Sequence, residues 1–127
     1  MTHRKRILLV DDDHDFVEAT TAVLESVCDV DVAYGGGEGL AKARASRPDL
    51  ILLDVIMPDE DGFAVCDQLK ADPQLADVPV IMLTSLPDGL SPMGQAATRS
   101  GPCVEDYLEK PVKPKELLRR VSKLLSE

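Results

Sequence analysis

Residues 7–16, ILLVDDDHDF, decide the fold, because they pass directly from an apolar run into a cluster of carboxylates. The four aliphatic residues that open the stretch predict a buried strand. Asp11, Asp12 and Asp13 follow at once, and Asp15 adds a fourth acid. Two like charges about 4 Å apart repel by roughly 4 kcal/mol at an effective dielectric of 20. The cluster therefore predicts a cation or a helix terminus that offsets this repulsion.

Apolar runs and helical patterns alternate along the rest of the chain. Strands are predicted at 6–10, 29–34, 49–55, 78–85 and 103–109, and helices at 14–27, 35–47, 61–72 and 114–127. The run at 49–55 is apolar except at its ends, which is typical of a strand buried on both faces. Strands that alternate with helices indicate an α/β domain with a parallel sheet, right-handed crossovers and helices on both faces.

Two helices have clear apolar positions, and one has poor helix propensity. In the helix at 14–27 we expect Phe16, Ala19, Val23 and Val27 to face the core, and in the helix at 61–72 Phe63, Val65, Cys66 and Leu69. The segment 86–102 contains three prolines and three glycines. We therefore predict a short or displaced fourth helix near 93–100, flanked by irregular loop.

Composition limits the class of protein. A length of 127 residues favours a single domain over 1–127, and a net charge of −9 argues against direct binding to nucleic acid or to anionic membranes. Three scattered cysteines, Cys28, Cys66 and Cys103, contain no CxxC pair and predict reduced thiols in a cytoplasmic protein. The basic start resembles a signal peptide, but its apolar stretch has only four residues, so we expect neither secretion nor a membrane span.

Reactive side chains follow four of the five predicted strands. Asp11, Asp12 and Asp13 end the first strand, Asp54 the third, Thr84 and Ser85 the fourth, and Lys110 the fifth. Ligands of open α/β sheets bind beyond the carboxyl ends of the strands, so we expect these groups to converge. Clustered carboxylates suit Mg²⁺, and a carboxylate beside such a cation can attack a phosphoryl group to give an aspartyl phosphate. The cation and the lysine would neutralise charge on the transferring oxygens.

Four pieces of the chain, LLVDDD, DLILLDVIMPDEDG, VIMLTS and YLEKP, occur in the order found in a known family. With them, the sequence resembles the CheY-like receiver domain of response regulators in two-component signalling, from residue 6 to about 125. The resemblance implies a flavodoxin-like sheet of order 2-1-3-4-5 and a cytoplasmic phosphoacceptor rather than an enzyme. A sensor histidine kinase or a phosphotransfer protein of a phosphorelay would donate the phosphoryl group from a phosphohistidine, and a phosphorylation-dependent dimer is a further option.

The resemblance also assigns roles to single residues. Asp54 corresponds to the phosphoacceptor, Asp12 to the direct ligand of Mg²⁺ or Mn²⁺, and Asp11 to its partner acting through a metal-bound water. The backbone carbonyl of Ile56 would be a further metal ligand. Lys110 would pair with Asp54 and then with the phosphoryl group.

The remaining roles concern the response to phosphorylation. Thr84 corresponds to the switch hydroxyl, and Tyr107 to the aromatic residue that repacks when Thr84 moves, although simple packing of Tyr107 stays an alternative. The Lys110–Pro111 bond is expected to be cis. Ile56 and Leu86 lie two residues beyond Asp54 and Thr84, where receivers admit the hydrolytic water, and two aliphatic side chains there predict a long-lived phosphoryl group. The 26-residue step from Thr84 to Lys110 looks longer than usual.

Other interpretations stay open at this stage. LLVDDDHDF also resembles the first motif of haloacid-dehalogenase-type phosphatases, with Asp11 as nucleophile and Asp13 as acid/base. In that reading, Asp15 replaces the usual Thr or Val, no acidic pair follows Lys110, and Asp54 has no role. A pseudo-receiver that docks without phosphorylation is the third class. Asp13 and Asp15 are expected to begin the following helix, since acids favour helix N-termini, and the same explanation could cover the whole cluster. His3 and His14 are expected to face solvent, and Cys28 and Cys66 to pack in the core.

Overall fold

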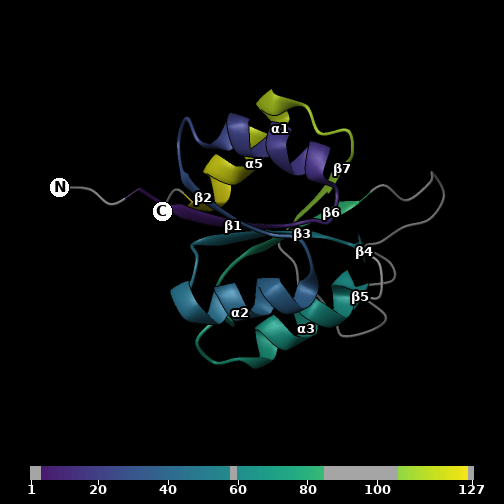
Figure 1. The fold of residues 1–127 in the computed structure, drawn as a ribbon. Coiled ribbons are helices and arrows are strands. Elements are labelled where there is room, and N and C mark those ends of the chain that lie inside the picture. The colour runs from purple at the N-terminus through teal and green to yellow at the C-terminus, as the bar shows by residue number, and fades with distance from the viewer. Residues whose placement is uncertain (1–3, 58–59, 85–105, 126–127) are drawn as a thin grey trace.

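The structure is a computed structural model that describes residues 4–57, 60–84 and 106–125 of the chain. Figure 1 shows one sheet between two layers of helices, with α1 and α5 on one face and α2 and α3 on the other. The sheet has the order β2-β1-β3-β6-β7, and all of its strand pairs are parallel. Because β6 and β7 are the fourth and fifth strands of this sheet, the order confirms the predicted 2-1-3-4-5 arrangement.

The observed elements follow the predicted alternation, and within the described residues none extends beyond its predicted bounds. The strands of the sheet are β1 (Arg6–Val10), β2 (Asp29–Ala33), β3 (Leu50–Asp54), β6 (Val80–Thr84) and β7 (Asp106–Glu109). The helices are α1 (His14–Leu24), α2 (Gly36–Ser46), α3 (Gly62–Ala71) and α5 (Pro114–Leu125). A small antiparallel ribbon that the sequence did not predict joins β4 (Ile56–Met57) to β5 (Glu60–Asp61). The predicted fourth helix near 93–100 lies outside the described residues.

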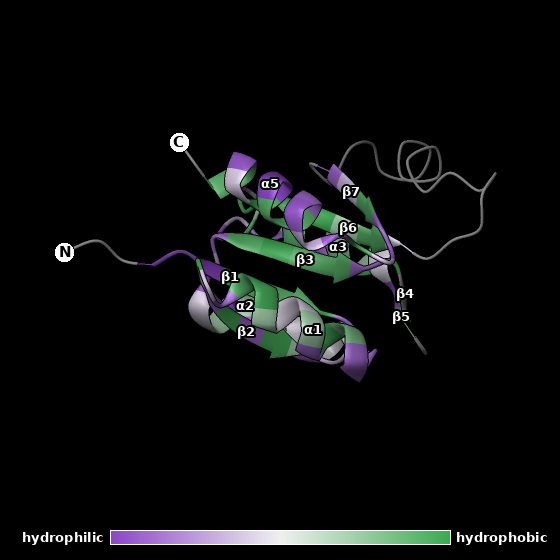
Figure 2. Cartoon of the chain, turned by 90° about the horizontal axis from the view of Figure 1, so that it is seen from above, coloured by the Kyte–Doolittle hydropathy of each residue, from purple (hydrophilic) through white to green (hydrophobic). Residues whose placement is uncertain are grey.

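The sheet divides the core into two apolar clusters. Alternate side chains of β1 and β3 point to opposite faces, so Leu8 and Ile51 pack toward α2 and α3, while Leu9 and Leu52 pack toward α1 and α5. Every residue of β3 and β6 is buried, as expected for central strands covered on both sides. Figure 2 shows these strands as almost entirely hydrophobic, whereas the helices carry both hydrophobic and hydrophilic residues, the latter most plainly on α5.

The predicted inner face of the first helix is wrong in part. Val17, Thr20 and Leu24 are the buried residues of α1, whereas Ala19 is exposed. The helix ends at Leu24, so Val27 lies beyond it and is 52% exposed. The prediction passed over Thr20 because it is polar, and this shifted the apolar stripe around the helix. In α3 the four predicted positions, Phe63, Val65, Cys66 and Leu69, are all buried.

The outer strand β2 has side chains on its open backbone edge. Ala33 accepts a hydrogen bond from Asp11 on the inner side, so the polar backbone groups of Val32 point outward. The Val32 N–H donates to the Asp31 carboxylate over 3.0 Å, and Lys42 Nζ from α2 donates to the Val32 carbonyl. Lys42 also lies 3.4 Å from Asp31. Asp31 and Lys42 thus form an ion pair and together bind the outward-facing N–H and carbonyl of Val32, an arrangement that we call a clasp.

The opposite outer strand, β7, has a clasp of the same kind. The Tyr107 N–H donates to the Asp106 carboxylate over 2.8 Å, and Arg120 Nη1 from α5 donates to the Tyr107 carbonyl over 3.4 Å. Arg120 pairs with Asp106 at 2.6 Å and with Glu116 at 2.6 Å. In both outer strands, therefore, an aspartate of the strand accepts from an outward-facing N–H. A lysine or arginine of the neighbouring helix donates to the carbonyl of the same residue.

The helices of this fold are short. None of the helices within the described residues has the length and apolar character that a membrane span requires. Each of them instead presents buried residues to one face of the sheet. The carboxyl ends of the strands are not covered in this way, and polar side chains meet there.

Candidate functional site

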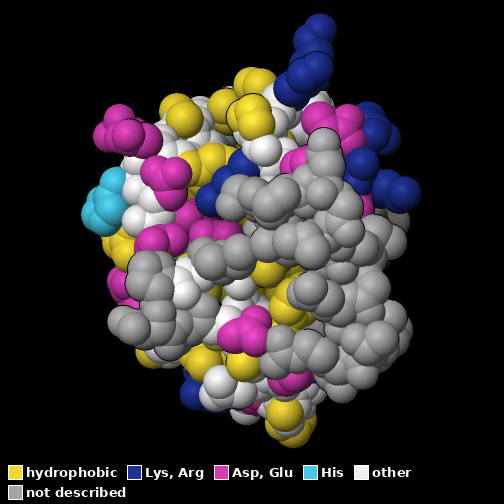
Figure 3. All heavy atoms as spheres, turned by 90° about the vertical axis from the view of Figure 1, so that its right-hand side faces the viewer, with side chains coloured by type: hydrophobic (Ala, Val, Ile, Leu, Met, Phe, Trp, Pro, Cys, Tyr) yellow, Lys and Arg dark blue, Asp and Glu magenta, His cyan; other side chains and the backbone are white. Residues whose placement is uncertain are grey.

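The predicted carboxylates meet at the carboxyl edge of the sheet. β1 lies beside β3 with Val10 opposite Leu53, so the next residues, Asp11 and Asp54, are neighbours in space. Asp11 is fully buried, Asp54 is 4% exposed, and Asp12 is half-buried. One oxygen from each of these three carboxylates lies within 4.8 Å of the others. Figure 3 faces this end of the sheet and shows acidic side chains gathered there, with basic ones beside them.

Lys110 supplies positive charge at this site and lies closer to Asp11 than to Asp54. Its Nζ lies 2.7 Å from Asp11 Oδ2 and 3.7 Å from Asp54 Oδ2. The ion pair predicted with Asp54 is present, and a shorter one with Asp11 was not foreseen. The contact with Asp11 is an ion pair rather than an aligned hydrogen bond. Lys110 also lies over the ring of Phe16, 4.4 Å from its centre.

The next acids of the sequence belong to the start of α1. Asp13 is the N-cap residue, and its side chain accepts a hydrogen bond from the Phe16 N–H over 3.2 Å. Asp15 lies in the first turn, where a negative charge is favourable. The Asp13 N–H in turn donates to Asp11 Oδ1 over 3.0 Å. The helix-start explanation is therefore confirmed for Asp13 and Asp15, while Asp11 and Asp12 gather with Asp54.

Gly62 has a function in this site that the sequence analysis missed. Its N–H donates to the Val55 carbonyl over 2.8 Å, which brings the start of α3 against the end of β3. A Cβ atom at this position would lie 2.3 Å from the backbone oxygen of Asp54. Asp61 caps α3 through the Phe63 N–H over 2.8 Å. The Asp-Gly pair in the quoted motif was the available signal, because it marks a turn where the backbone approaches closely.

The two residues predicted to respond to phosphorylation, Thr84 and Tyr107, lie on the fourth and fifth strands of the sheet. Thr84 ends β6 and is 7% exposed, and its carbonyl accepts a hydrogen bond from the Lys110 N–H over 2.7 Å. Tyr107 is half-buried in β7, opposite Met82, and packs against the cluster on the α2 and α3 face. The Lys110–Pro111 peptide bond is cis, as predicted. Ser85 and Leu86 lie outside the described residues.

Three residues that the sequence did not assign to the site lie outside it. His14 is exposed, as predicted, and its ring stacks on Tyr34 with 4.2 Å between the centroids, a contact that the sequence did not suggest. Cys28 and Cys66 are both buried, as expected for packing residues. Burial raises the pKa of the Cys28 thiol, so this group remains protonated at neutral pH.

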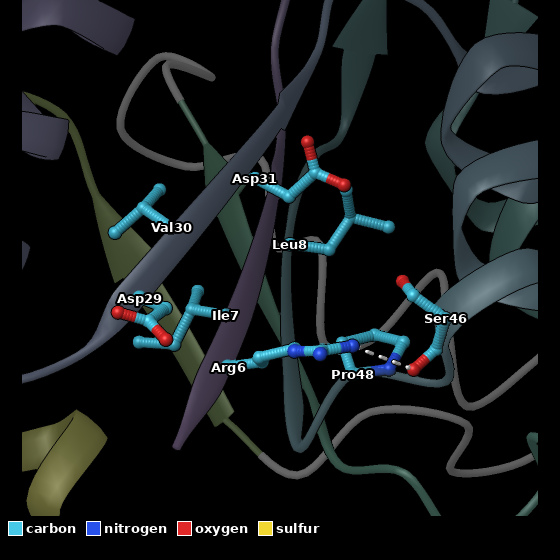
Figure 4. Close-up of a pocket in the computed structure, with 8 residues that line it drawn as sticks. All are labelled: Arg6, Ile7, Leu8, Asp29, Val30, Asp31, Ser46 and Pro48. Carbon is cyan, nitrogen blue, oxygen red and sulfur yellow. Dashed lines mark hydrogen bonds between the residues drawn. The ribbon is translucent and has the colours of Figure 1, made fainter. Parts of the chain in front are cut away.

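A hollow at the other end of the sheet contains none of the predicted site residues. It has a volume of about 210 Å³ and lies where β1 and β2 begin, beside the end of α2 (Figure 4). Its lining residues include Arg6, Leu8, Asp31, Ser46 and Pro48. Arg6 crosses the hollow and donates to the Ser46 carbonyl over 3.4 Å. The chemistry that the sequence predicts is therefore confined to the carboxyl end.

Comparison with known sequences agrees with this geometry. The family model described as response regulator receiver domain matches residues 7–122. The DNA-binding response regulator MtrA of Mycobacterium tuberculosis is 42% identical over 121 residues, which cover 94% of this chain and 50% of MtrA. The response regulator PleD of Caulobacter vibrioides is 41% identical over 124 residues, which cover 94% of this chain and 26% of PleD. The chain thus spans about half of one relative and about a quarter of the other.

Solved structures of similar proteins share the whole fold. The chemotaxis protein CheY4 of Vibrio cholerae has a TM-score of 0.84 at 31% identity, covering 95% of this chain and 98% of that one. The DrrB receiver domain, solved in a form activated by BeF3, has a TM-score of 0.82 at 28% identity, covering 97% of this chain and 98% of that one. With the acidic trio in place and almost the entire chain matched, the protein belongs to the response regulator receiver domain family, whose members are signalling phosphoacceptors rather than classical enzymes.

Proposed function

We propose that Asp54 accepts the phosphoryl group and that Lys110, Thr84 and the neighbouring carboxylates assist the transfer. The observation that carries this assignment is the convergence of three carboxylates within 4.8 Å, with the ammonium of Lys110 3.7 Å from Asp54. Asp54 is the member of the trio that lies at the centre of the sheet, between β1 and β6. An attacking carboxylate placed there can be reached from the open end of the strands.

The donor set fits a divalent cation such as Mg²⁺ or Mn²⁺. Mg²⁺ prefers oxygen ligands and is usually bound by one or two carboxylates together with water and phosphate. Asp12 would bind the ion directly, Asp11 would act through a bound water, and Asp54 and the backbone carbonyl of Ile56 would complete the protein's share. When bound, the ion supplies positive charge that stabilises the transferring phosphoryl oxygens.

The transfer itself exchanges one bond of phosphorus for another. A carboxylate oxygen of Asp54 attacks the phosphorus, the bond from phosphorus to the donor imidazole nitrogen breaks, and the nitrogen keeps the electron pair. Lys110 stabilises the negative charge on the phosphoryl oxygens, because a cation at this largely buried position is screened little by water. Its side chain is 15% exposed, and its Nζ lies within 3.7 Å of Asp54, the proposed acceptor.

Thr84 and Tyr107 would convert this local change into a change of surface. The Thr84 hydroxyl would donate to a phosphoryl oxygen, and the inward movement would let Tyr107 repack. Thr84 is opposite Glu109 and Tyr107 is opposite Met82, so the two residues are two positions apart in the register of adjacent strands. Phosphorylation would in this way shift an equilibrium between two arrangements of that side.

Two further expectations concern the lifetime of the product and the partners. Ile56 and Leu86 are aliphatic where water would approach, so we propose slow hydrolysis of the aspartyl phosphate. A variant with polar residues at both positions should lose the phosphoryl group faster.

The donor would be a sensor histidine kinase or a phosphotransfer protein in the cytoplasm. Because MtrA is named as DNA-binding and this chain covers half of it, DNA contact would belong to a longer regulator rather than to this acidic domain.

The assignment of Asp54 can be tested with acetyl phosphate and Mg²⁺. Intact-mass measurement should show one added phosphoryl group on the wild-type protein and none on Asp54→Asn, and peptide mapping should place the group on Asp54. Retained incorporation by Asp54→Asn at the wild-type rate would contradict the proposal. A label on Asp11 would indicate phosphatase-like chemistry, and no label from acetyl phosphate or from a phosphohistidine donor would indicate a docking module.

A further inference from the structure

The side chain of Phe16 is the unexplained neighbour of the lysine in this site. Phe16 is the third residue of α1, and it is half-buried against the core cluster between the sheet and the α1 and α5 layer. Its ring lies under Lys110, with 4.4 Å from Nζ to the ring centre. A cation at this distance from an aromatic face is attracted by the negative charge density of the ring, and the attraction is stronger where water is excluded.

Four contacts form a closed circuit through this ring. Asp11 Oδ1 accepts from the Asp13 N–H, and the Asp13 carboxylate accepts from the Phe16 N–H. The Phe16 ring contacts Lys110, and Lys110 pairs with the second oxygen of Asp11. The N-cap that starts α1 therefore also fixes the backbone of Phe16 relative to Asp11. As a result, the ring and Asp11 hold the ammonium from two directions.

Such a second contact matters because lysine is a poorly constrained cation. Its ammonium is a compact point charge on a flexible four-carbon stem, and a single ion pair fixes its distance from an anion but not its direction. The 2.7 Å contact with Asp11 would allow Nζ to swing out toward water. Nζ also lies 3.7 Å from Asp54 in this arrangement, and the ring of Phe16 adds a third contact beside the two carboxylates.

We infer that Phe16 is a positioning residue, which holds the Lys110 ammonium in the site between Asp11 and Asp54. The inference rests on the proposed role of Asp54 for its functional consequence, but the placement of the lysine can be measured without any phosphorylation. Phe16 does not touch a reacting atom, and its effect passes through Lys110 alone. That dependence is what separates positioning from ordinary packing.

The first test is a double-mutant cycle with Phe16→Leu and Lys110→Met, measured by urea unfolding without metal. Leucine keeps an apolar side chain but removes the aromatic face. The cycle should give a coupling of about two- to fivefold in the unfolding equilibrium constant, as expected for a partly exposed cation–π contact. Loss of packing at Phe16 cancels in the cycle, so strictly additive effects would overturn the inference.

A direct measurement covers the case in which Lys110→Met unfolds. The Lys110 ε-methylene protons should show an upfield ring-current shift in the NMR spectrum of the wild-type protein. The shift should vanish in Phe16→Leu and return in Phe16→Tyr, which restores an aromatic face. Val23→Ala, at a half-buried position on the same helix, is the matched control and should leave the shift unchanged. An unshifted signal in the wild-type protein would overturn the inference.

The functional consequence is measured as the rate of phosphorylation by acetyl phosphate. Phe16→Leu should lower the rate about two- to fivefold, and Phe16→Tyr should stay near the wild-type rate. In the Lys110→Met background, Phe16→Leu should change the rate little, because there is no ammonium left to position. An equal loss in both backgrounds would overturn the inference. Failure of the Asp54 assignment would instead appear as phosphate at another residue, with the coupling and the NMR shift unchanged.

Discussion

The two ends of the parallel sheet carry charges of the same kinds in opposite environments. At the carboxyl end, Asp11 is fully buried and Asp54 nearly so, and the two share one lysine whose side chain is 15% exposed. At the amino end, Arg4 pairs with Asp29 at 3.1 Å, and these side chains are 49% and 62% exposed. Removing charges from water costs several kcal/mol per ion, whereas an exposed pair contributes about 0–1 kcal/mol in either direction.

This difference in burial distinguishes charges that have little effect on stability from charges that cost stability. The exposed pair at the amino end joins the segment before β1 to the first residue of β2, and its loss should have little effect. The buried carboxylates and lysine at the carboxyl end lower the stability of the fold. Their proposed contribution is to bind a cation and a phosphoryl group. The strongest tests of the comparison therefore alter the carboxyl end first and use the amino end or a solvent-facing site as the control.

The largest effect is expected at the glycine that supports the carboxyl end. Gly62→Ala would place a Cβ 2.3 Å from the Asp54 backbone oxygen and 2.8 Å from Val55, so the chain between β3 and α3 must move. We expect the free energy of unfolding to fall by about 3 kcal/mol, measured by urea denaturation. Gly37→Ala is the matched control, because nothing lies within 4 Å of its added Cβ. A Gly62→Ala protein as stable as wild type would contradict the close approach.

Removal of the shared lysine should have the next largest effect. Lys110→Met leaves Asp11 and Asp54 without the cation that pairs with both, and we expect a loss of about 3 kcal/mol of stability in metal-free buffer at neutral pH. The change at the amino end that removes only the ion pair, Asp29→Asn, should cost less than about 1 kcal/mol, because Arg4 keeps its hydrogen bonds to the Glu25 and Cys28 carbonyls. Equal losses for the two variants would show that burial does not distinguish the two ends.

Addition of Mg²⁺ should stabilise the carboxyl end selectively. A ligand that binds only the folded state at one hundred times its dissociation constant raises the free energy of unfolding by about 2.7 kcal/mol. Thermal unfolding with and without Mg²⁺ should show this gain for the wild-type protein and for Asp29→Ala, whose missing carboxylate lies at the amino end. The gain should be lost in Asp12→Ala. A gain that survives Asp12→Ala would place the ion elsewhere.

The smallest effect is expected at an exposed acid far from the carboxylate trio. The Tyr34 N–H and Lys42 lower the pKa of Glu38 below its usual value. Because the folded-state pKa is the lower one, this contribution to stability is present above the ordinary pKa and is lost as the pH falls through the folded-state pKa. Glu38→Gln should cost less than about 0.5 kcal/mol at pH 7, since the side chain is 45% exposed. The difference from wild type should shrink as the pH falls through the lowered folded-state pKa, and a difference that grew on acidification would contradict this sign.

Much of the site followed from the sequence because it depends on strand ends. Once the apolar runs before Asp11, Asp54, Thr84 and Lys110 are read as parallel strands, the geometry of a sheet brings these residues to one edge. The same reasoning could not place Lys110 nearer to Asp11 than to Asp54. The position of Lys110 depends on the side chains packed around it, among them the ring of Phe16, and the orientation of a helix residue toward a distant strand cannot be read from strand ends.

The errors have similar physical origins. The stripe of α1 was misplaced because Thr20 is buried although it is polar, and Val27 is exposed although it is apolar. Hydrophobic periodicity cannot detect either case. The ribbon of β4 and β5 was missed because strands of two residues leave almost no pattern. The importance of Gly62 was missed because a close backbone approach depends on the path of the chain after the turn.

The clasps on β2 and β7 have a consequence for how other chains can join this molecule. A strand added to either edge would gain hydrogen bonds with Val32 or Tyr107 only after displacing an aspartate and a lysine or arginine that already bond to those peptides. It would also have to bury the released charges. Growth of the sheet from one molecule to the next is therefore opposed at both Val32 and Tyr107, which protects the apolar sheet from edge-to-edge aggregation.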